Sequence, residues 1–152
     1  MLIERKNVGD LREKLTGKKI VFTNGCFDII HVGHVRYLTT AKSFGDVLIV
    51  GLNTDESVRK LKGESRPINN QNDRAEVLLG LKAVDYVIFF GEQTAENIIA
   101  EVKPDIYVKG GDYTLDTLPE SKIVQSYGGR VELVKFLEGH STTNIIKAIN
   151  KM

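Results

Sequence analysis

Two histidines, His31 and His34, stand three positions apart between an apolar segment and the first helical pattern that follows it. At this spacing both imidazoles project from the same side of a helix N-terminus. Such a terminus offers free backbone N–H groups and the positive end of the helix dipole, and both suit a phosphate. Gly33 carries no side chain, so a bulky ligand can approach the backbone there. The pattern predicts imidazoles that donate hydrogen bonds to phosphate oxygens during phosphoryl or nucleotidyl transfer.

The residues near the histidines leave other chemistry open. A histidine pair can hold zinc, but the chain has only one further histidine and one cysteine to complete such a site. Asp28 could assist a Mg²⁺ ion or, equally, support the turn between strand and helix. We interpret Cys26 as a small packing residue rather than a nucleophile, because nucleotidyl transfer needs no covalent intermediate. A lone cysteine cannot form an internal disulfide, which is typical of a cytoplasmic protein.

Three hydroxyl residues, Ser141, Thr142 and Thr143, open the last helical pattern of the chain. Their ordinary role is to cap the free N–H groups of the helix, and at least one of them should do so. Because this helix follows the last expected strand, its N-terminus should share a sheet edge with the histidines. It can therefore bind phosphate as well.

A basic cluster spans residues 59–67, which we expect to form a loop whose glycine and proline restrict the backbone. Its ordinary role would be that of a solvated surface. Lysines there could instead neutralise a triphosphate or the phosphate of an acceptor. Lys62 is the first candidate for this role and Lys60 the second, and Arg66 is a candidate for the acceptor phosphate.

Two further segments supply candidates. Asp73 and Arg74 begin a helical pattern, where the dipole favours an acidic residue and the arginine would ordinarily be solvated. Gly110 and Gly111 follow an expected strand. Paired glycines form simple turns, but they also let a backbone approach a flat base or a ribose.

Short apolar segments rich in Val, Ile, Tyr and Phe predict five strands, and helical patterns lie between them. This alternation predicts an α/β fold, a doubly wound Rossmann-like parallel sheet of five strands with helices on both faces. Such sheets bind ligands at the carboxyl ends of their strands. The expected strands are residues 19–23, 47–52, 84–90, 106–109 and 131–136, and the expected helices are residues 8–15, 32–44, 73–82, 94–102, 119–127 and 141–150.

Length and composition restrict the class of protein. The chain has 152 residues, 41% of them hydrophobic, which suits a single domain with residues 1–17 as an N-terminal helical extension. Lys and Arg number 21 against 20 Asp and Glu, and the net charge of +1 argues against a general nucleic-acid or membrane-surface role. No apolar run approaches the roughly 18 residues of a spanning helix. We therefore expect a cytoplasmic protein.

Residues 25–34 read G-x-F-D-x-x-H-x-G-H, which resembles the signature of the cytidylyltransferase-like nucleotidyltransferases, the HxGH superfamily. The resemblance continues in order through residues 61–67, 108–113 and 138–146, and so covers nearly the whole chain. It implies an enzyme that joins a nucleoside triphosphate to a phosphorylated acceptor and releases pyrophosphate. It also implies that His31, His34 and Lys62 are catalytic residues.

The same resemblance implies where the substrates bind. Lys60, Arg66 and Arg74 would contact the acceptor or its phosphate. Mg²⁺ would accompany ATP, held mainly by the phosphates, with Asp28 as a further candidate ligand. The nucleotide would be bound by Gly25, Cys26, Phe27, Asp28, Gly33, Lys109, Gly111, Asp112, Ser141, Thr142 and Thr143.

Within the family, residues 62–67 and 109–113 are most similar to the branch that makes ADP-heptose for the lipopolysaccharide core, whereas residues 138–146 resemble the motif of its sugar- and polyol-phosphate members in general. That branch joins ATP to D-glycero-D-manno-heptose 1-phosphate. The resemblance implies a free-standing form, with a separate kinase and phosphatase supplying the substrate. It also implies a homodimer whose partners are small-molecule substrates, with no nucleic acid and no membrane.

Three alternatives remain at this stage. CTP with glycerol 3-phosphate is the nearest, because the motifs are shared and no residue distinguishes adenine from cytosine by a rule that we can state. A non-catalytic nucleotide-binding module belongs to a different class, and retention of both histidines and of the lysine cluster argues against it. A metal-binding protein that uses His31 and His34 is the third.

Overall fold

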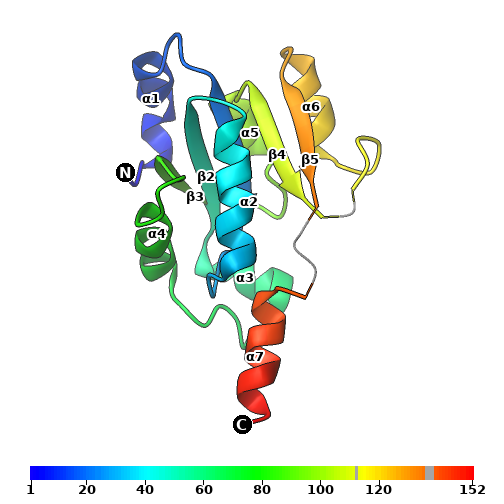
Figure 1. Ribbon diagram of the computed structural model, residues 1–152. Helices are drawn as coiled ribbons and strands as arrows, with labels where there is room; N and C mark the ends of the chain where they lie inside the picture. Colours follow the sequence, from blue (N-terminus) through cyan, green and yellow to red (C-terminus); the bar gives the residue numbers. More distant parts are fainter. Residues whose placement is uncertain (112, 136–138) are drawn as a thin grey trace.

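The computed structural model describes residues 1–111, 113–135 and 139–152, and it contains one parallel sheet with helices on both faces (Figure 1). The strands lie in the order β3-β2-β1-β4-β5, and each neighbouring pair is parallel. The expected doubly wound α/β fold is therefore confirmed. The strands are β1 (Ile20–Gly25), β2 (Val47–Asn53), β3 (Tyr86–Phe90), β4 (Ile106–Gly110) and β5 (Arg130–Val134).

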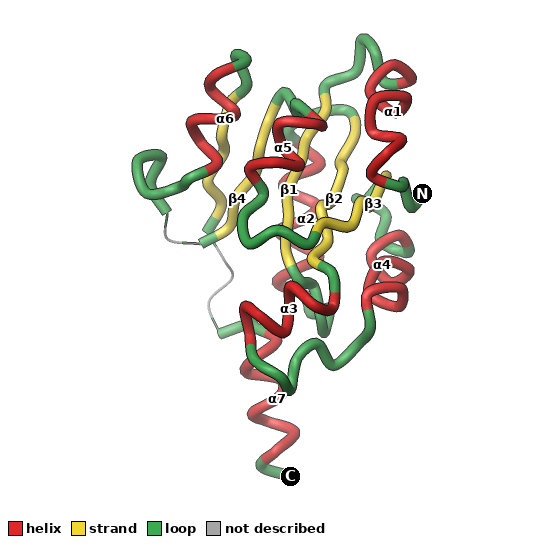
Figure 2. Tube along the Cα trace, turned by 180° about the vertical axis from the view of Figure 1, so that it is seen from behind, coloured by secondary structure: helices red, strands yellow, loops and turns green. Residues whose placement is uncertain are grey.

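Two apolar cores lie on opposite faces of the sheet, because successive strand side chains point to opposite sides. Ile20 and Phe22 of β1 pack with α1, α5 and α6, whereas Val21 packs with α2 and α4. The view from behind places α1, α5 and α6 in front of the strands and α2 beyond them (Figure 2). These helices are α1 (Val8–Lys14), α2 (Val32–Ser43), α4 (Gln71–Leu79), α5 (Glu96–Val102) and α6 (Glu120–Ser126).

The strand order creates an opening at the carboxyl ends of β1 and β4. After β3 the chain crosses to the far side of β1 to form β4, so the connections that leave these two strands diverge. Ligands of open α/β sheets bind at such a switch point. Two further helices, α3 (Asp55–Lys62) and α7 (Thr142–Asn150), gather beyond this edge of the sheet (Figure 1).

Helix α3 corrects the expectation that residues 59–67 form a loop, because residues 59–62 are its last turn. Thr54 caps the helix by accepting a hydrogen bond from Ser57 N, and Asp55 and Glu56 occupy the first turn, where the dipole favours acidic residues. These start signals were present in the sequence, but the polar character of the segment concealed them.

The N-terminal segment covers one edge of the sheet. Ile3 N donates to Val87 O at 2.9 Å, and Val87 N donates to Met1 O at 3.1 Å, so the first residues pair with β3. A short 3-10 helix, η1 (Arg5–Asn7), leads into α1, whose side chains enter the core with α5. In the part of the chain that the structure describes, no helix is both long and apolar enough to cross a bilayer.

Candidate active site

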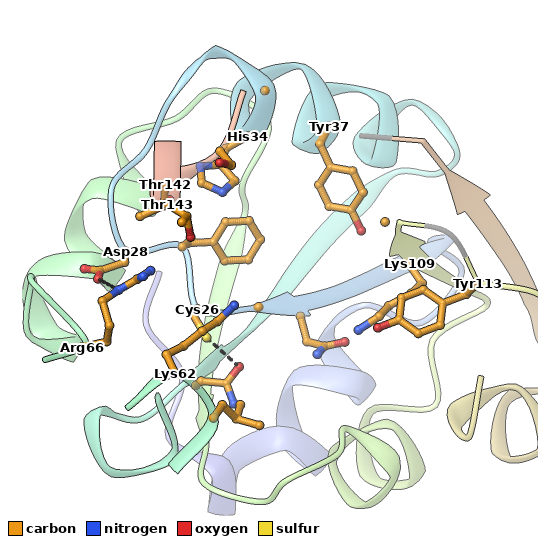
Figure 3. A pocket seen from close by; sticks show the side chains of 18 of the residues that line it. Cys26, Asp28, His34, Tyr37, Lys62, Arg66, Lys109, Tyr113, Thr142 and Thr143 are labelled. Carbon is orange, nitrogen blue, oxygen red and sulfur yellow. Dashed lines mark hydrogen bonds and ion pairs between the residues drawn. The ribbon is translucent and has the colours of Figure 1, made fainter. Parts of the chain in front are cut away.

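A cleft of about 640 Å³ opens at the carboxyl ends of the strands (Figure 3). Strand β1 contributes Asn24 and Gly25, β2 contributes Asn53, and β4 contributes Lys109 and Gly110. The start of α2 and the segment before α7 bring all three histidines of the chain to the same cleft. The predicted phosphate-binding segments thus meet where the switch point of the sheet lies.

The two histidines of the β1–α2 connection hold each other in place. His31 is the N-cap of α2, and its Nδ1 accepts a hydrogen bond from Gly33 N at 3.1 Å. His34 returns the contact, because its Nδ1 accepts from His31 N at 3.4 Å. The two rings stack with their centroids 3.9 Å apart. This reciprocal cap orients both imidazoles before any ligand binds.

The lowered pKa values of both imidazoles favour their neutral form at neutral pH, with the proton on Nε2. Burial, and then the neighbouring His31, lowers the pKa of His34 to about 4. Burial, and then His140, also lowers the pKa of His31. Since each Nδ1 already accepts a hydrogen bond, the single proton of each neutral ring lies on Nε2. The pair therefore supplies two fixed N–H donors, which suit oxygens whose negative charge grows in a transition state.

Gly33 and Phe27 shape the turn around these rings. A Cβ at Gly33 would lie 2.8 Å from Cε1 of His31, so a larger residue would displace the imidazole. Phe27 has a φ of 45°, a left-handed conformation that is unfavourable for a bulky residue. In this conformation the buried Phe27 ring meets His34 edge-on, with centroids 5.3 Å apart. The strained turn thus provides the support behind His34.

The N-terminus of α7 lies against the same side of the cleft. Ser141 Oγ caps the helix by accepting from Asn144 N at 3.0 Å. The hydroxyl of Thr142 donates to Ile29 O at 3.0 Å and so ties α7 to the β1–α2 connection. Thr143 is exposed and lies beside Thr142 (Figure 3). All three hydroxyl residues line the cleft, and we call them, together with His31 and His34, the histidine wall.

Asp28 supports a loop, which is one of the two roles that the sequence left open for it. Its carboxylate accepts hydrogen bonds from Ile68 N at 2.7 Å, from Asn69 N at 2.8 Å and from Arg66 Nε at 3.2 Å. The side chain is fully buried, and both of its oxygens accept hydrogen bonds from groups of the protein. Asp28 thereby holds Arg66 at the border of the cleft (Figure 3).

The two candidate lysines of α3 lie on different sides of the helix, because two positions correspond to about 200° of rotation. Lys62 lines the cleft, and its side chain lies near Cys26 (Figure 3). Lys60 is outside the cleft lining: its side chain is 70% exposed, and its Nζ lies 3.5 Å from Glu56 Oε1. The structure therefore brings the first candidate, Lys62, to the cleft and places the second, Lys60, outside its lining.

Arg74 is buried beneath the cleft, where it does not reach the surface expected for an acceptor contact. Its residue exposure is 1%. Nη1 donates to Cys26 O at 2.8 Å and to Asn53 O at 2.9 Å, and Nη2 donates to Asp55 Oδ1 at 2.8 Å. The guanidinium thus joins the end of β1, the end of β2 and the start of α3. Arg74 is a positioning residue for the floor of the cleft.

The segment after β4 brings Lys109 and Tyr113 to the cleft. Nζ of Lys109 lies 5.3 Å from the centroid of the Tyr113 ring, within cation–π range (Figure 3). Gly110 lines the cleft, whereas the predicted nucleotide contact Gly111 does not. Asp112, for which the family resemblance also implies a nucleotide contact, lies outside the described residues.

Cys26 borders the cleft as a protonated thiol. Burial raises its pKa, and Sγ lies 3.9 Å from Asn53 Oδ1. This environment agrees with the interpretation of Cys26 as a packing residue. Across residues 1–111, 113–135 and 139–152, no group of three His, Cys, Asp or Glu side chains is placed to hold a metal ion.

The sequence reasoning missed a second set of polar residues that line the cleft. Gln93 and Thr94 precede α5, Glu120 begins α6, and Asn24 belongs to β1. We call these four residues the second wall. Three separate elements bring them together, so no local motif marks them. The only signal in the sequence was their position, since each lies at or after the carboxyl end of an expected strand.

Comparison with protein families gives one match over most of the chain. The model of a family described as Cytidylyltransferase-like matches residues 22–148. That interval begins within β1 and ends within α7, and so includes both walls of the cleft.

Individual relatives extend this result. The chain is 58% identical over 139 residues to the "Bifunctional protein HldE" of Geobacter sulfurreducens, and 60% identical over 137 residues to the protein of the same name in Aliarcobacter butzleri. These matches cover 91% and 89% of this chain but only 28% of either relative. A crystal structure of a lipopolysaccharide core biosynthesis protein from Thermoplasma volcanium is 32% identical. It superposes with a TM-score of 0.67 over 82% of this chain and 100% of that one.

Proposed function

The chain belongs to the cytidylyltransferase-like family of nucleotidyltransferases, and from this premise we propose that it joins a sugar 1-phosphate to a nucleoside triphosphate with release of pyrophosphate. We propose that the substrates are ATP and D-glycero-D-manno-heptose 1-phosphate and that the product is ADP-heptose. The observation that carries the proposal is the reciprocal cap of His31 and His34, which aims two neutral donors into the cleft.

The proposed reaction is a single in-line displacement. A phosphate oxygen of the acceptor attacks the α-phosphorus of ATP and forms the new O–P bond. The bond from the α-phosphorus to the bridging oxygen breaks, and pyrophosphate leaves with that electron pair. Positioning and charge stabilisation carry the catalysis, so the protein needs no nucleophile of its own. The protonated thiol of Cys26 is consistent with this scheme.

Each side of the cleft has a role in this scheme. His31 and His34 donate from Nε2 to the oxygens of the reacting phosphate, and Lys62 neutralises the charge that develops there. The N-terminus of α7, with Ser141, Thr142 and Thr143, holds the β- and γ-phosphates. Arg66, oriented by Asp28, holds the phosphate of the acceptor.

We propose that the remaining contacts to the nucleotide come from the end of β1, the β1–α2 connection with the start of α2, and the end of β4. They comprise backbone and side-chain contacts of Gly25, Cys26, Phe27, Gly33 and Lys109, all of which line the cleft.

Magnesium would enter with ATP rather than in a protein cage. The carboxylate of Asp28 is used by three N–H donors, and the described residues contain no cluster of metal ligands. Mg²⁺ commonly binds through substrate phosphates and water, with few protein ligands. When bound in that way it would neutralise phosphate charge, and the residues of the histidine wall would still orient the phosphates.

The choice of heptose rests on the resemblance of residues 62–67 and 109–113 to the ADP-heptose branch of the family. The similarity to the lipopolysaccharide core biosynthesis protein of Thermoplasma volcanium supports a sugar nucleotide as the product. CTP with glycerol 3-phosphate is the second candidate, because the histidine wall would serve either pair of substrates. The structure offers no further observation that favours it.

The test is pyrophosphate release from ATP or CTP, each combined with D-glycero-D-manno-heptose 1-phosphate or glycerol 3-phosphate in the presence of Mg²⁺. We expect release with ATP and the heptose phosphate alone. Release only with CTP and glycerol 3-phosphate would keep the site and the mechanism but contradict the proposed substrates. Nucleotide binding without release from any pair would favour a non-catalytic module.

We also propose that residues 1–152 form one unit and act as a cytoplasmic homodimer. Helix α7 projects beyond the sheet (Figure 1), and its Ile149 is 57% exposed, which leaves apolar surface for a second copy. Light scattering should give twice the mass of the chain, and Ile149→Glu should shift the protein toward the monomer. Cell fractionation should recover the protein with the soluble enzymes. A monomer in solution or a membrane-bound fraction would contradict these assignments.

A further inference from the structure

The second wall contains a buried carboxylate that the fold leaves half used. Glu120 is 4% exposed and lines the cleft. Its Oε1 accepts a long hydrogen bond of 3.4 Å from Ala95 N. Its Oε2 accepts none from any residue that the structure describes. Buried polar atoms are nearly always hydrogen-bonded, because an orphaned acceptor destabilises the fold. This oxygen is therefore available to accept a hydrogen bond from a group that enters the cleft.

Groups that can donate hydrogen bonds lie near this carboxylate. The hydroxyl of Tyr107 donates to Asn24 Oδ1. Burial, and then the charge of Glu120, raises the pKa of Tyr107 well above its usual range, so this hydroxyl keeps its proton. With its oxygen engaged, Asn24 can offer its amide hydrogens, which bond to no residue in the described parts of the chain. The wall thus presents one acceptor and one donor to the same cleft.

The surroundings of Glu120 favour a neutral polyhydroxylated group over a phosphate. Ala95, whose N–H contacts the Glu120 carboxylate, directly follows Gln93 and Thr94 in the chain. Both of these polar residues line the cleft. Phe90 and Leu118 add apolar surface. A buried carboxylate repels a phosphate in a site of low dielectric. A sugar instead presents hydroxyls that both donate and accept, together with C–H faces for apolar contact.

We infer that Glu120 accepts hydrogen bonds from hydroxyls of the acceptor sugar and thereby selects polyhydroxylated acceptors. This inference rests on the proposed function, because it names the substrate contacted by the second wall. The acceptor would lie with its phosphate toward Arg66 and Lys62 and its hydroxyls toward Glu120 and Asn24. The ribose of ATP also carries neighbouring hydroxyls, so the test has to separate the two sources.

The test compares Glu120→Gln with Glu76→Gln as a matched control. Glu76 is exposed on α4 and lies outside the cleft lining. The measurements are kcat, both KM values by pyrophosphate release, and the melting temperature. For E120Q we expect the KM of heptose 1-phosphate to rise about tenfold, in line with the loss of a charge-assisted hydrogen bond, while the KM of ATP changes less than about twofold. The melting temperature should not fall, because an orphaned carboxylate has been removed.

Each other outcome has a distinct meaning. A rise in the KM of ATP alone would overturn the inference and assign the carboxylate to the ribose. Unchanged KM values, or a lower melting temperature with unchanged KM values, would overturn it in favour of a purely structural role. Absence of turnover by the wild-type protein with ATP and heptose 1-phosphate would contradict the proposed function itself, and the inference with it.

A second measurement does not depend on the fold of a variant. Monodeoxy analogues of heptose 1-phosphate each remove one hydroxyl from the acceptor. For the wild-type protein, at least one analogue should lower kcat/KM about tenfold. Glu120→Gln should respond much less to that same analogue, because the partner of the missing hydroxyl is already gone. Equal kcat/KM for all analogues with the wild-type protein would overturn the inference.

Discussion

The histidine wall and the second wall of the cleft differ in how far the fold satisfies their polar atoms. On the histidine wall, Nδ1 of each imidazole is occupied, and only the outward Nε2 is left for a ligand. On the second wall, the Glu120 carboxylate is buried with one oxygen unpartnered among the described residues. We therefore interpret one wall as a set of donors that the fold holds in place, and the other as an acceptor surface that a ligand would complete.

This difference teaches how one cleft can orient two substrates that both carry phosphate. In the proposed scheme, neutral imidazoles, a helix N-terminus and Lys62 attract phosphates to one side of the cleft. In the same scheme, the carboxylate of Glu120 disfavours phosphates on the other side and accepts hydrogen bonds from hydroxyls. An acceptor that carries a phosphate at one end and hydroxyls along its length is thereby aligned for attack without a covalent intermediate.

Removing a donor from the histidine wall should have the largest effect. We expect His34→Ala to lower kcat by about 10³-fold, because the oxygens of the transition state lose a fixed donor. His34→Gln is the matched variant, since Gln at this position of a helix can still accept from the N-cap N–H. It should keep the melting temperature of the wild-type protein but not its turnover. Near wild-type turnover of His34→Ala would show that His34 is not needed as a donor, and H34Q separates that role from support of the helix.

Substitution of the two lysines of α3 tests which of them contacts the reacting phosphate. Lys62→Ala should lower kcat by about 10²-fold, because it removes a charge-assisted contact to the reacting phosphate. Lys60→Ala, two positions away on the exposed side, should change kcat less than about twofold, as expected for a surface ion pair. Steady-state pyrophosphate release measures both. Equal losses for the two variants would contradict the division that the structure shows.

The neutral state of the imidazoles predicts a specific dependence of stability on pH. The pKa of His34 falls from 6.5 to about 4 on folding, so the unfolded chain binds more protons between these values. The contribution of His34 to the free energy of unfolding should therefore be fully present above pH 6.5, and it should be lost as the pH falls from 6.5 toward 4. Urea unfolding at pH 7 and pH 5 measures this. His34→Gln should weaken the dependence, and His31, whose pKa is also lowered, should retain part of it.

The smallest expected effect concerns the support of the second wall. Arg5 donates to Glu92 at 2.6 Å and pairs with Glu101 at 2.5 Å, and so holds the segment that carries Gln93. The hydrogen bond from Arg5 lowers the pKa of Glu92 to about 2, so the pair stays ionised at neutral pH.

Arg5→Ala should raise the acceptor's KM about twofold and lower the melting temperature by about 2–4 °C, as expected for a partly exposed network. Lys6→Ala, which removes only an exposed pair with Glu4, is the control. A change in the KM of ATP instead would contradict the assignment of this wall to the acceptor.

The sequence predicted the sheet and the histidine wall because their signals are local. Short apolar segments marked the strands, and one continuous stretch carried both His31 and His34. The exchange of hydrogen bonds between them, and their lowered pKa values, depend on burial that the sequence does not display.

The remaining differences arise from contacts between distant segments. Arg74 reaches across to β1 and β2, which its local pattern did not indicate. Glu120 resembles any acidic residue at the start of a helix, and only the packing of α5 and α6 buries it beside the cleft. Helix periodicity would have separated Lys60 from Lys62, had the start of α3 been recognised.

The central claim is that two walls align two substrates for one direct displacement at phosphorus. The most direct measurement is the stereochemical course of the reaction with one P-chiral isomer of adenosine 5′-O-(1-thiotriphosphate) and heptose 1-phosphate, analysed by ³¹P NMR of the product. A single in-line displacement predicts inversion at the α-phosphorus. Retention would contradict it, because retention requires two displacements and a covalent nucleotidyl–protein intermediate.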